Sequence, residues 1–301
     1  MKRVICFIGI LTIMACNSET IDQIPEQEAC DGGTFVGRVT LTTQQQVNDF
    51  GAMCYTKIDG SLSLVDINEP TDKILNLTPL NSLTEIYSET NTDSLFGSLY
   101  VTTSHLLNFN GLDNLTKVSM LRIVENESLT NLDGLSGLSE ITGDNSGFNM
   151  LQISANQNLN NIDGLENLKH VGKEDYFTKF IIVGNSQLSN IDGFQSLMTI
   201  GGPNSQNDSQ SPSLSIYYND SLENLDGLSN LNFVKGYLRF ISGSDLIGPN
   251  GPEFYGNSNL TDYCGLQNLL MNGIYGGYIW SQYYDGYNPT VQDIIDGNCS
   301  Q

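Results

Sequence analysis

The chain is poor in positive charge. Its 301 residues include 12 Lys and Arg against 34 Asp and Glu, which gives a formal net charge of −22. Nucleic-acid binding needs clustered cations to neutralise phosphates, so the composition argues against a nucleic-acid partner. A hydrophobic content of 39% indicates a folded protein. We expect the acidic residues to form a solvated exterior. A specific cation-binding role is the alternative.

Residues typical of catalytic and metal sites are scarce. The two histidines, His105 and His170, are remote in sequence and have no repeated Ser or Cys partner. No C-x-x-C is present, so a zinc site is only a weak alternative for the cysteines. The basic residues at outward strand positions, Arg122 and Arg239, are four strands apart, roughly 19 Å at ~4.8 Å per strand. We therefore expect no enzyme, cofactor or metal, although carboxylate pairs for glycoside hydrolysis remain open.

No apolar run is long enough to span a bilayer. Residues 4–14 are apolar, follow Lys2 and Arg3, and lead into Ala15-Cys16. This arrangement resembles the bacterial lipobox, which implies a lipoprotein signal peptide (1–15) and acylation, including palmitate, at Cys16. We expect an acidic tether (16–29) and an exported protein anchored in the outer membrane of a Gram-negative bacterium, on either its periplasmic or its surface face. An ordinary signal peptide with an incidental Cys is the alternative.

The remaining cysteines lie in two pairs, one near each end of the chain, with a long cysteine-free region between them. Four cysteines allow three pairings. Export permits disulfides, and a repeat array keeps its two ends apart. We therefore expect one disulfide at each end, Cys30–Cys54 and Cys264–Cys299.

An internal repeat dominates residues 58–272. The stretches 120–143 and 150–172 match position for position, from an L-x-I strand through an Asn to N-[LI]-D-G-L. One unit is too short to bury its own apolar positions, so successive units must stack as a solenoid. Alternating apolar positions predict strands at 61–65, 98–102, 120–124, 150–154, 179–183, 213–217 and 237–241.

Two polar signatures recur in these repeats, and we expect both to be structural. Stacked units would place the post-strand asparagines in a ladder that satisfies backbone groups; these are Asn126, Asn156, Asn185, Asn219 and Asn257. Each Asp-Gly predicts a turn in which Gly accepts a positive φ and Asp bonds its neighbouring backbone. The aspartates are Asp133, Asp163, Asp192 and Asp226, and calcium binding is their alternative role.

The two ends of the array differ from the repeats. Residues 30–57 predict an N-terminal cap, with a strand at 35–41 and a short helix that begins at a capping box of Thr43 and Gln46. Val47 and Phe50 would share one face of that helix. Residues 273–301 predict a C-terminal cap, with sugar or partner stacking as the alternative role of its aromatic cluster, Tyr275, Tyr278, Trp280, Tyr283, Tyr284 and Tyr287.

The pattern resembles the receptor L domain of growth-factor receptor ectodomains, fungal wall proteins and bacterial lipoproteins. The resemblance rests on the segment from Val47 through Cys54 to Leu62 and on the N-x-x-L-x-x-[LI]-x-G-L units, and it covers about residues 35–272. It implies an all-β fold, a right-handed β-helix of about seven irregular coils. It also implies ligand recognition by the exposed side of one sheet and adjacent loops, with no catalytic residues to carry over.

Outward strand positions are therefore the candidate ligand surface. They form two weakly charged and unusually apolar rows, which typically mark an interaction site unless the insertions at 88–97, 144–149, 173–178, 202–212 and 243–256 cover them. One row is Tyr100, Arg122, Gln152, Ile181, Ser215 and Arg239. The other is Thr102, Val124, Ser154, Val183, Tyr217 and Ile241.

We expect ligand binding by Tyr100, Arg122, Val124, Gln152, Ile181, Val183, Tyr217 and Arg239. The predicted function is a lipid-anchored, cell-envelope binding or adhesion module that recognises an extracellular protein or glycan. An envelope scaffold without a discrete ligand is one alternative. A β-helical carbohydrate-active enzyme is the other.

Overall fold

The computed structural model describes residues 32–66, 71–88, 97–143, 148–172, 177–202, 212–242, 247–248, 251–252, 257–282 and 289–301. The chain divides into two compact units, Met1–Cys30 and Asp31–Gln301, and every described residue belongs to the second. Cys16, the tether and Cys30 lie outside the described residues. So do Tyr283, Tyr284 and Tyr287, and most of each predicted insertion.

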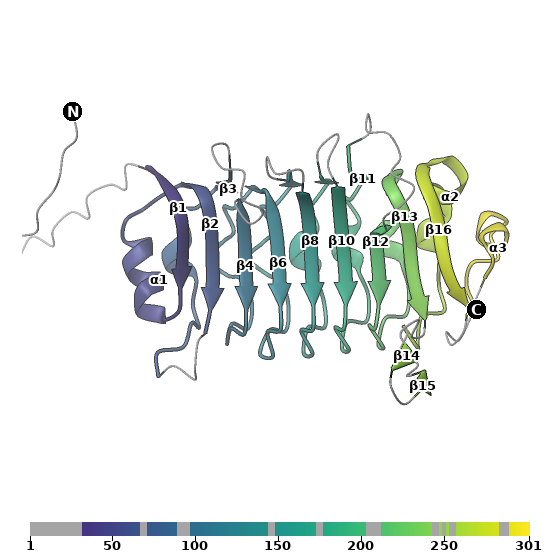
Figure 1. Ribbon diagram of the computed structural model, residues 1–301, viewed down its shortest axis with the longest axis horizontal. Helices are drawn as coiled ribbons and strands as arrows, with labels where there is room; N and C mark the ends of the chain where they lie inside the picture. Colours follow the sequence, from purple (N-terminus) through teal and green to yellow (C-terminus); the bar gives the residue numbers. More distant parts are fainter. Residues whose placement is uncertain are drawn as a thin grey trace, which may run out of the picture. The chain divides into compact units, whose positions relative to one another are not determined.

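The second unit is built mainly of strands, and its described part contains one 14-stranded sheet in which all pairings are parallel. Its long strands lie side by side in chain order and point the same way (Figure 1). They are β1 (Thr34–Leu41), β2 (Lys57–Val65), β4 (Ser98–Thr102), β6 (Met120–Val124), β8 (Phe148–Ser154), β10 (Phe177–Val183), β12 (Pro212–Tyr217), β13 (Phe233–Ser242) and β16 (Ile274–Gln282). The predicted strands fall within these elements.

A second ladder of short strands connects β2 to β13, and sequence analysis missed it. Each repeat adds two or three residues, which pair in parallel with the equivalent residues of the next repeat. A buried β-branched residue lies in each, such as Val118 and Ile141. These strands are β3 (Glu85–Tyr87), β5 (Lys117–Val118), β7 (Glu140–Ile141), β9 (His170–Val171) and β11 (Thr199–Ile200).

The core is one continuous cluster of apolar side chains contributed by every repeat. In the repeat that begins with β6, seven side chains are at most 1% exposed: Leu121, Ile123, Leu129, Leu132, Leu135, Leu138 and Ile141. Burial of each such side chain contributes about 1.5–3 kcal/mol. Single 3-10 turns join the two ladders at η1 (Thr78–Leu80), η2 (Asp163–Leu165), η3 (Asp192–Phe194), η4 (Asp226–Leu228) and η5 (Cys264–Leu266).

The N-terminal cap contains the predicted helix, α1 (Gln44–Gly51). Thr43 Oγ1 accepts a hydrogen bond from Gln46 N at 3.2 Å, as a capping box requires. The reciprocal bond is displaced by one residue, because Gln46 Oε1 accepts from Thr42 N at 2.7 Å. Val47 is fully buried, and the ring of Phe50 lies 5.5 Å from that of Phe35.

The C-terminal end is less purely β than predicted. It contains α2 (Gln267–Asn272) and α3 (Val291–Ile295), and the latter begins at a capping box of Thr290 and Asp293. Cys264 and Cys299 form the predicted disulfide, which excludes a Cys54–Cys264 pairing. Cys54 is itself disulfide-bonded. A small antiparallel pair, β14 (Ile247–Gly248) and β15 (Gly251–Pro252), follows β13.

The five post-strand asparagines form a continuous ladder of hydrogen bonds inside the unit. All are at most 1% exposed. Asn126 shows the pattern: its backbone N and its Nδ2 both donate to Oδ1 of Asn156, each at 3.0 Å. Asn156 Nδ2 in turn donates to Ile123 O at 3.1 Å and to Asn185 Oδ1 at 3.1 Å. The ladder begins at Ser104, whose N and Oγ donate to Asn126 Oδ1.

A left-handed residue precedes four of the five ladder asparagines. Glu125, Ala155 and Tyr218 have φ of 57°, 57° and 59°, although none is a glycine. An L-residue in this region costs roughly 1–2 kcal/mol. Gly184 has a φ of 69° at the equivalent place without that cost. The hydrogen bonds of the ladder offset the strain of the sharp turn out of each long strand.

The Asp-Gly turns differ from prediction at the Asp in all four repeats and at the Gly in three of them. The turn hydrogen bond belongs to the Asn two positions earlier, since Asn161 Oδ1 accepts from Asp163 N at 3.3 Å. The equivalent asparagines Asn131, Asn190 and Asn224 do the same for Asp133, Asp192 and Asp226. The prediction that each Asp side chain bonds its neighbouring backbone is therefore wrong, because the Asn of N-x-D-G supplies the acceptor.

The turn glycines are needed for space in most repeats. Gly134 has a positive φ of 95°, but Gly164 and Gly193 do not. A Cβ at Gly164 would overlap the carbonyl oxygen of Leu132 in the preceding repeat. Close approach between successive backbones, and not a left-handed conformation, therefore selects glycine in these turns.

We predict that Asn156→Ala lowers the free energy of unfolding by about 3 kcal/mol or more, because it leaves buried donors of Asn126 without an acceptor. The shift of the urea midpoint measures this loss. Asn160→Ala is the control, since Asn160 is exposed in the same repeat and should change stability by less than about 0.5 kcal/mol. Equal effects of the two substitutions would contradict a stabilising ladder.

Candidate ligand-binding site

The outward positions of the long strands line up in register, as the sequence pattern requires. The first row continues from Ser63 of β2 through Tyr100, Arg122, Gln152, Ile181, Ser215 and Arg239. The second runs from Val65 through Thr102, Val124, Ser154, Val183, Tyr217 and Ile241. We call these positions, together with Arg38, Thr40, Ser61, Ser98, Met120, Met150 and Lys179 on the same strands, the strand face.

Exposure divides the strand face into accessible and covered positions. Tyr100, Arg122, Val124, Gln152, Ile181, Val183 and Tyr217 are half-buried. Ser154 and Ser215 are each only 6% exposed and lie below their longer neighbours. The side chains of Arg239 and Ile241 are outside the description. The accessible surface is therefore made by long side chains that stand over small hydroxyl groups.

The strand face has the opposite charge from the rest of the protein. None of the positions named above is acidic, although the chain contains 34 Asp and Glu; Asp59, which pairs with Val36, is the next outward position of β2 and carries the one acid beside them. Its cations are Arg38, Arg122, Lys179 and Arg239. The strand face is therefore positively charged in a protein of net charge −22.

Arg122 is held in place by neighbours on the two adjacent strands. Its Cζ lies 4.7 Å from the ring centroid of Tyr100 on β4, a cation–π contact. On the other side, its Nε donates to Gln152 Oε1 of β8 at 3.2 Å. Gln152 Nε2 donates in turn to Ser154 Oγ at 3.0 Å. The guanidinium is thus oriented before any ligand arrives.

A small pocket of about 180 Å³ lies at the N-terminal part of the strand face. It joins the predicted residues Tyr100 and Arg122 to residues that sequence analysis missed. Sequence analysis placed Arg38 only in the cap strand. Its pairing with Ser61 of β2 puts it on the strand face. The full lining is Arg38, Thr40, Ser61, Ser63, Ser98, Tyr100 and Arg122.

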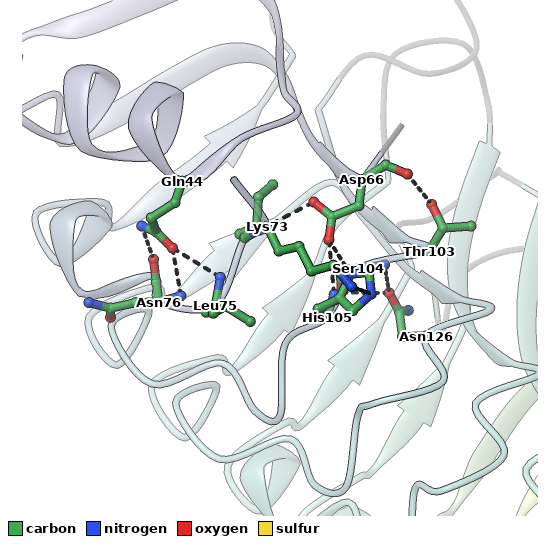
Figure 2. A network of polar contacts seen from close by, with 10 residues as sticks. Gln44, Asp66, Lys73, Leu75, Asn76, Thr103, Ser104, His105 and Asn126 are labelled. Carbon is green, nitrogen blue, oxygen red and sulfur yellow. Dashed lines mark hydrogen bonds and ion pairs between the residues drawn. The ribbon is translucent and has the colours of Figure 1, made fainter. Parts of the chain in front are cut away.

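His105 belongs to a separate polar network (Figure 2). Its Nδ1 lies 2.6 Å from Oδ2 of Asp66, and its Nε2 lies 2.8 Å from Lys73 Nζ. Because a lysine ammonium only donates, Nε2 accepts and Nδ1 carries the proton that bonds Asp66. The side chain of Asp66 is only 1% exposed. Its carboxylate also accepts a hydrogen bond from Ile74 N. This network holds the loop after β2 against the start of the asparagine ladder.

The two histidines do not come together. His170 lies on β9 and pairs through Nδ1 with Thr199 Oγ1 at 3.0 Å. A wider hollow of about 470 Å³ adjoins His105 and includes two acids, Glu125 and Glu127. In the part of the chain that the structure describes, no group of three or more His, Cys, Asp or Glu side chains could hold a metal ion.

The aspartates of the Asp-Gly turns form a column of like charge. Burial raises the pKa of Asp163 above its ordinary value, and the neighbouring charges of Asp192 and Asp133 raise it further. Burial and then the charges of Asp262 and Asp192 likewise raise the pKa of Asp226. Repulsion along this column acts against the folded state at neutral pH.

The predicted aromatic cluster is only partly described. Tyr275 of β16 packs against the core, which is a cap contact. Tyr278 and Trp280 lie on β16, which pairs with β13, and their side chains lie outside the described part of the structure. Among the described residues, no helix is both long and apolar enough to cross a membrane. Comparison with protein-family models, curated proteins and solved structures finds no match to this chain.

We predict that Asp163→Asn raises the melting temperature at pH 7, by an amount corresponding to less than about 1 kcal/mol because the group is largely exposed. The folded-state pKa is raised, so protonation favours the folded state. The penalty is full above the raised pKa and disappears as the pH falls to the ordinary Asp value. The gain should therefore shrink on acidification.

Differential scanning calorimetry between neutral and acidic pH measures this gain. Asp220→Asn, at an exposed aspartate outside the column, is the matched control and should leave the melting temperature unchanged. A lower melting temperature of Asp163→Asn at pH 7, or a gain that persists at acidic pH, would show that the column is not repulsive.

Proposed function

We propose that this protein is a cell-envelope binding or adhesion module that recognises its ligand through the strand face. The observation that carries the proposal is the excess of cations over acids on that face in a chain of net charge −22. Half-buried Ile181, Val183 and Tyr217 add apolar contact area beside the cations. Contiguous surfaces of this kind mark interaction sites.

We also propose the finer fold that the sequence predicts, a right-handed β-helix of about seven coils similar to the receptor L domain. Two parallel ladders, joined in every repeat by a buried turn, support it. In such a coil the long strands form one continuous sheet with a solvent side. That geometry gives a rigid platform for side chains of alternate positions.

The proposed location is the outer membrane, through a lipid on Cys16 after removal of residues 1–15. The lipobox-like sequence supports this proposal, and the Cys264–Cys299 disulfide agrees with an oxidising compartment. We further propose that the protein is not an enzyme. The separate hydrogen-bonding environments of His105 and His170 support that part of the proposal.

We predict that Cys16→Ser releases the full chain from the membrane fraction, because it removes the acylated thiol. Fractionation of cells, followed by detection of the protein in soluble and membrane pools, measures the effect. Cys6→Ser is the matched control and should leave membrane attachment intact. Retention of the Cys16 variant in membranes contradicts the anchor.

We predict that the double substitution Ile181→Asp and Val183→Asp weakens binding to cells, extracellular matrix and glycan arrays at least tenfold, because it places acids at two face positions. The control is Met198→Asp, at a side chain 42% exposed beside the short-strand ladder. Melting curves check that all variants are folded. Unaltered binding by the folded double variant would contradict the strand-face proposal and favour a scaffold without a discrete ligand.

A further inference from the structure

Arg122 retains most of its hydrogen-bonding capacity. A guanidinium has five N–H donors in a planar fork. Only Nε has a protein acceptor, Gln152 Oε1, and across the described residues no carboxylate forms an ion pair with Arg122. In a chain with 34 acids such a cation is unusual. The four remaining donors are available to an anion that enters the pocket.

The surroundings of Arg122 add a second cation and several hydroxyl groups. Arg38 lines the same pocket from β1. Ser61 and Ser98 are 5% and 3% exposed and form its floor. Thr40, Ser63 and Tyr100 complete the lining. This set can bind one anionic group and several neutral hydroxyls of the same ligand.

Screening makes the local charges decisive for a small anion. The Debye length is about 8 Å at physiological ionic strength. No acid is among the described residues that line the pocket, whereas Arg122 and Arg38 both line it. An anion at the pocket therefore responds to these two cations more than to the net charge of −22.

The chemistry of the pocket favours a sugar over a peptide. An extended peptide usually pairs with an open strand edge. Of the strands that line the pocket, β2, β4 and β6 are paired on both sides, and β1 alone is an edge of the described sheet. The volume of about 180 Å³ is below the roughly 300–1,000 Å³ of drug-sized sites. It suits a single ring unit whose hydroxyls meet the serine and threonine side chains.

We propose that this pocket binds a carboxylate-bearing sugar unit of an acidic polysaccharide, with Arg122 as the bidentate partner of the carboxylate. Planar fork-to-fork pairing is the geometry that arginine offers a carboxylate and lysine does not. Tyr100 and Gln152 act as positioning residues, because they hold the guanidinium from either side. This inference rests on the proposed use of the strand face for binding.

The test compares the purified full chain with Arg122→Gln and Arg122→Lys on an array of uronate, sialylated, sulfated and neutral oligosaccharides. Each carboxylated probe is paired with its carboxyl-reduced counterpart. The control is Lys117→Gln, which removes a cation of the preceding repeat from the short-strand ladder. Melting temperatures of all variants confirm folding. The dissociation constant of each hit is then measured by calorimetry.

We expect hits that require the carboxylate and weaken at least tenfold with either Arg122 substitution, while Lys117→Gln binds as the wild type does. Hits among neutral or sulfated sugars alone, or carboxylated hits indifferent to Arg122, overturn the inference. An array without hits overturns it too. In that case cell and matrix binding that is lost in the Ile181 and Val183 double variant still supports the strand face as a binding surface, so the two failures are distinguishable.

Discussion

The buried asparagine ladder is the interaction on which the rest of this structure depends. Asn126, Asn156, Asn185, Asn219 and Asn257 each accept from the preceding ladder residue and donate to a strand carbonyl of that repeat. Because every ladder position is fully paired, a slip of one repeat against the next would leave several buried donors unsatisfied. The ladder thus fixes strand register, and register places one repeat's outward side chain beside the next.

Register links this scaffold to recognition. The cation–π contact between Tyr100 and Arg122 and the hydrogen bond between Arg122 and Gln152 both join residues at equivalent positions of neighbouring strands. A shift by one residue would send these side chains to the core. Stacking of the repeats thus places the residues of the proposed binding surface side by side.

Much of the fold could be predicted because the repeat exposes its period in the sequence. The long strands, the asparagine ladder and the Cys264–Cys299 disulfide follow from alternation, spacing and the separation of the ends. The short-strand ladder was missed because two residues such as Lys117 and Val118 show no alternation. The turn chemistry was misassigned because Asn131 and Asp133 carry equivalent side-chain acceptors, and only geometry selects the Asn. Arg38 was missed because its place on the face depends on the pairing of β1 with β2.

Hydrogen exchange of the asparagine side-chain amides, followed by nuclear magnetic resonance, tests the central claim most directly. The account predicts that the Nδ2 protons of Asn126, Asn156, Asn185 and Asn219 exchange as slowly as the amides of the central long strands, because their release requires global unfolding. The surface amide of Asn158, which is exposed and bonds only Glu127 O, should exchange orders of magnitude faster. Equal rates at the ladder and at Asn158 would contradict the dependence of strand register on this ladder.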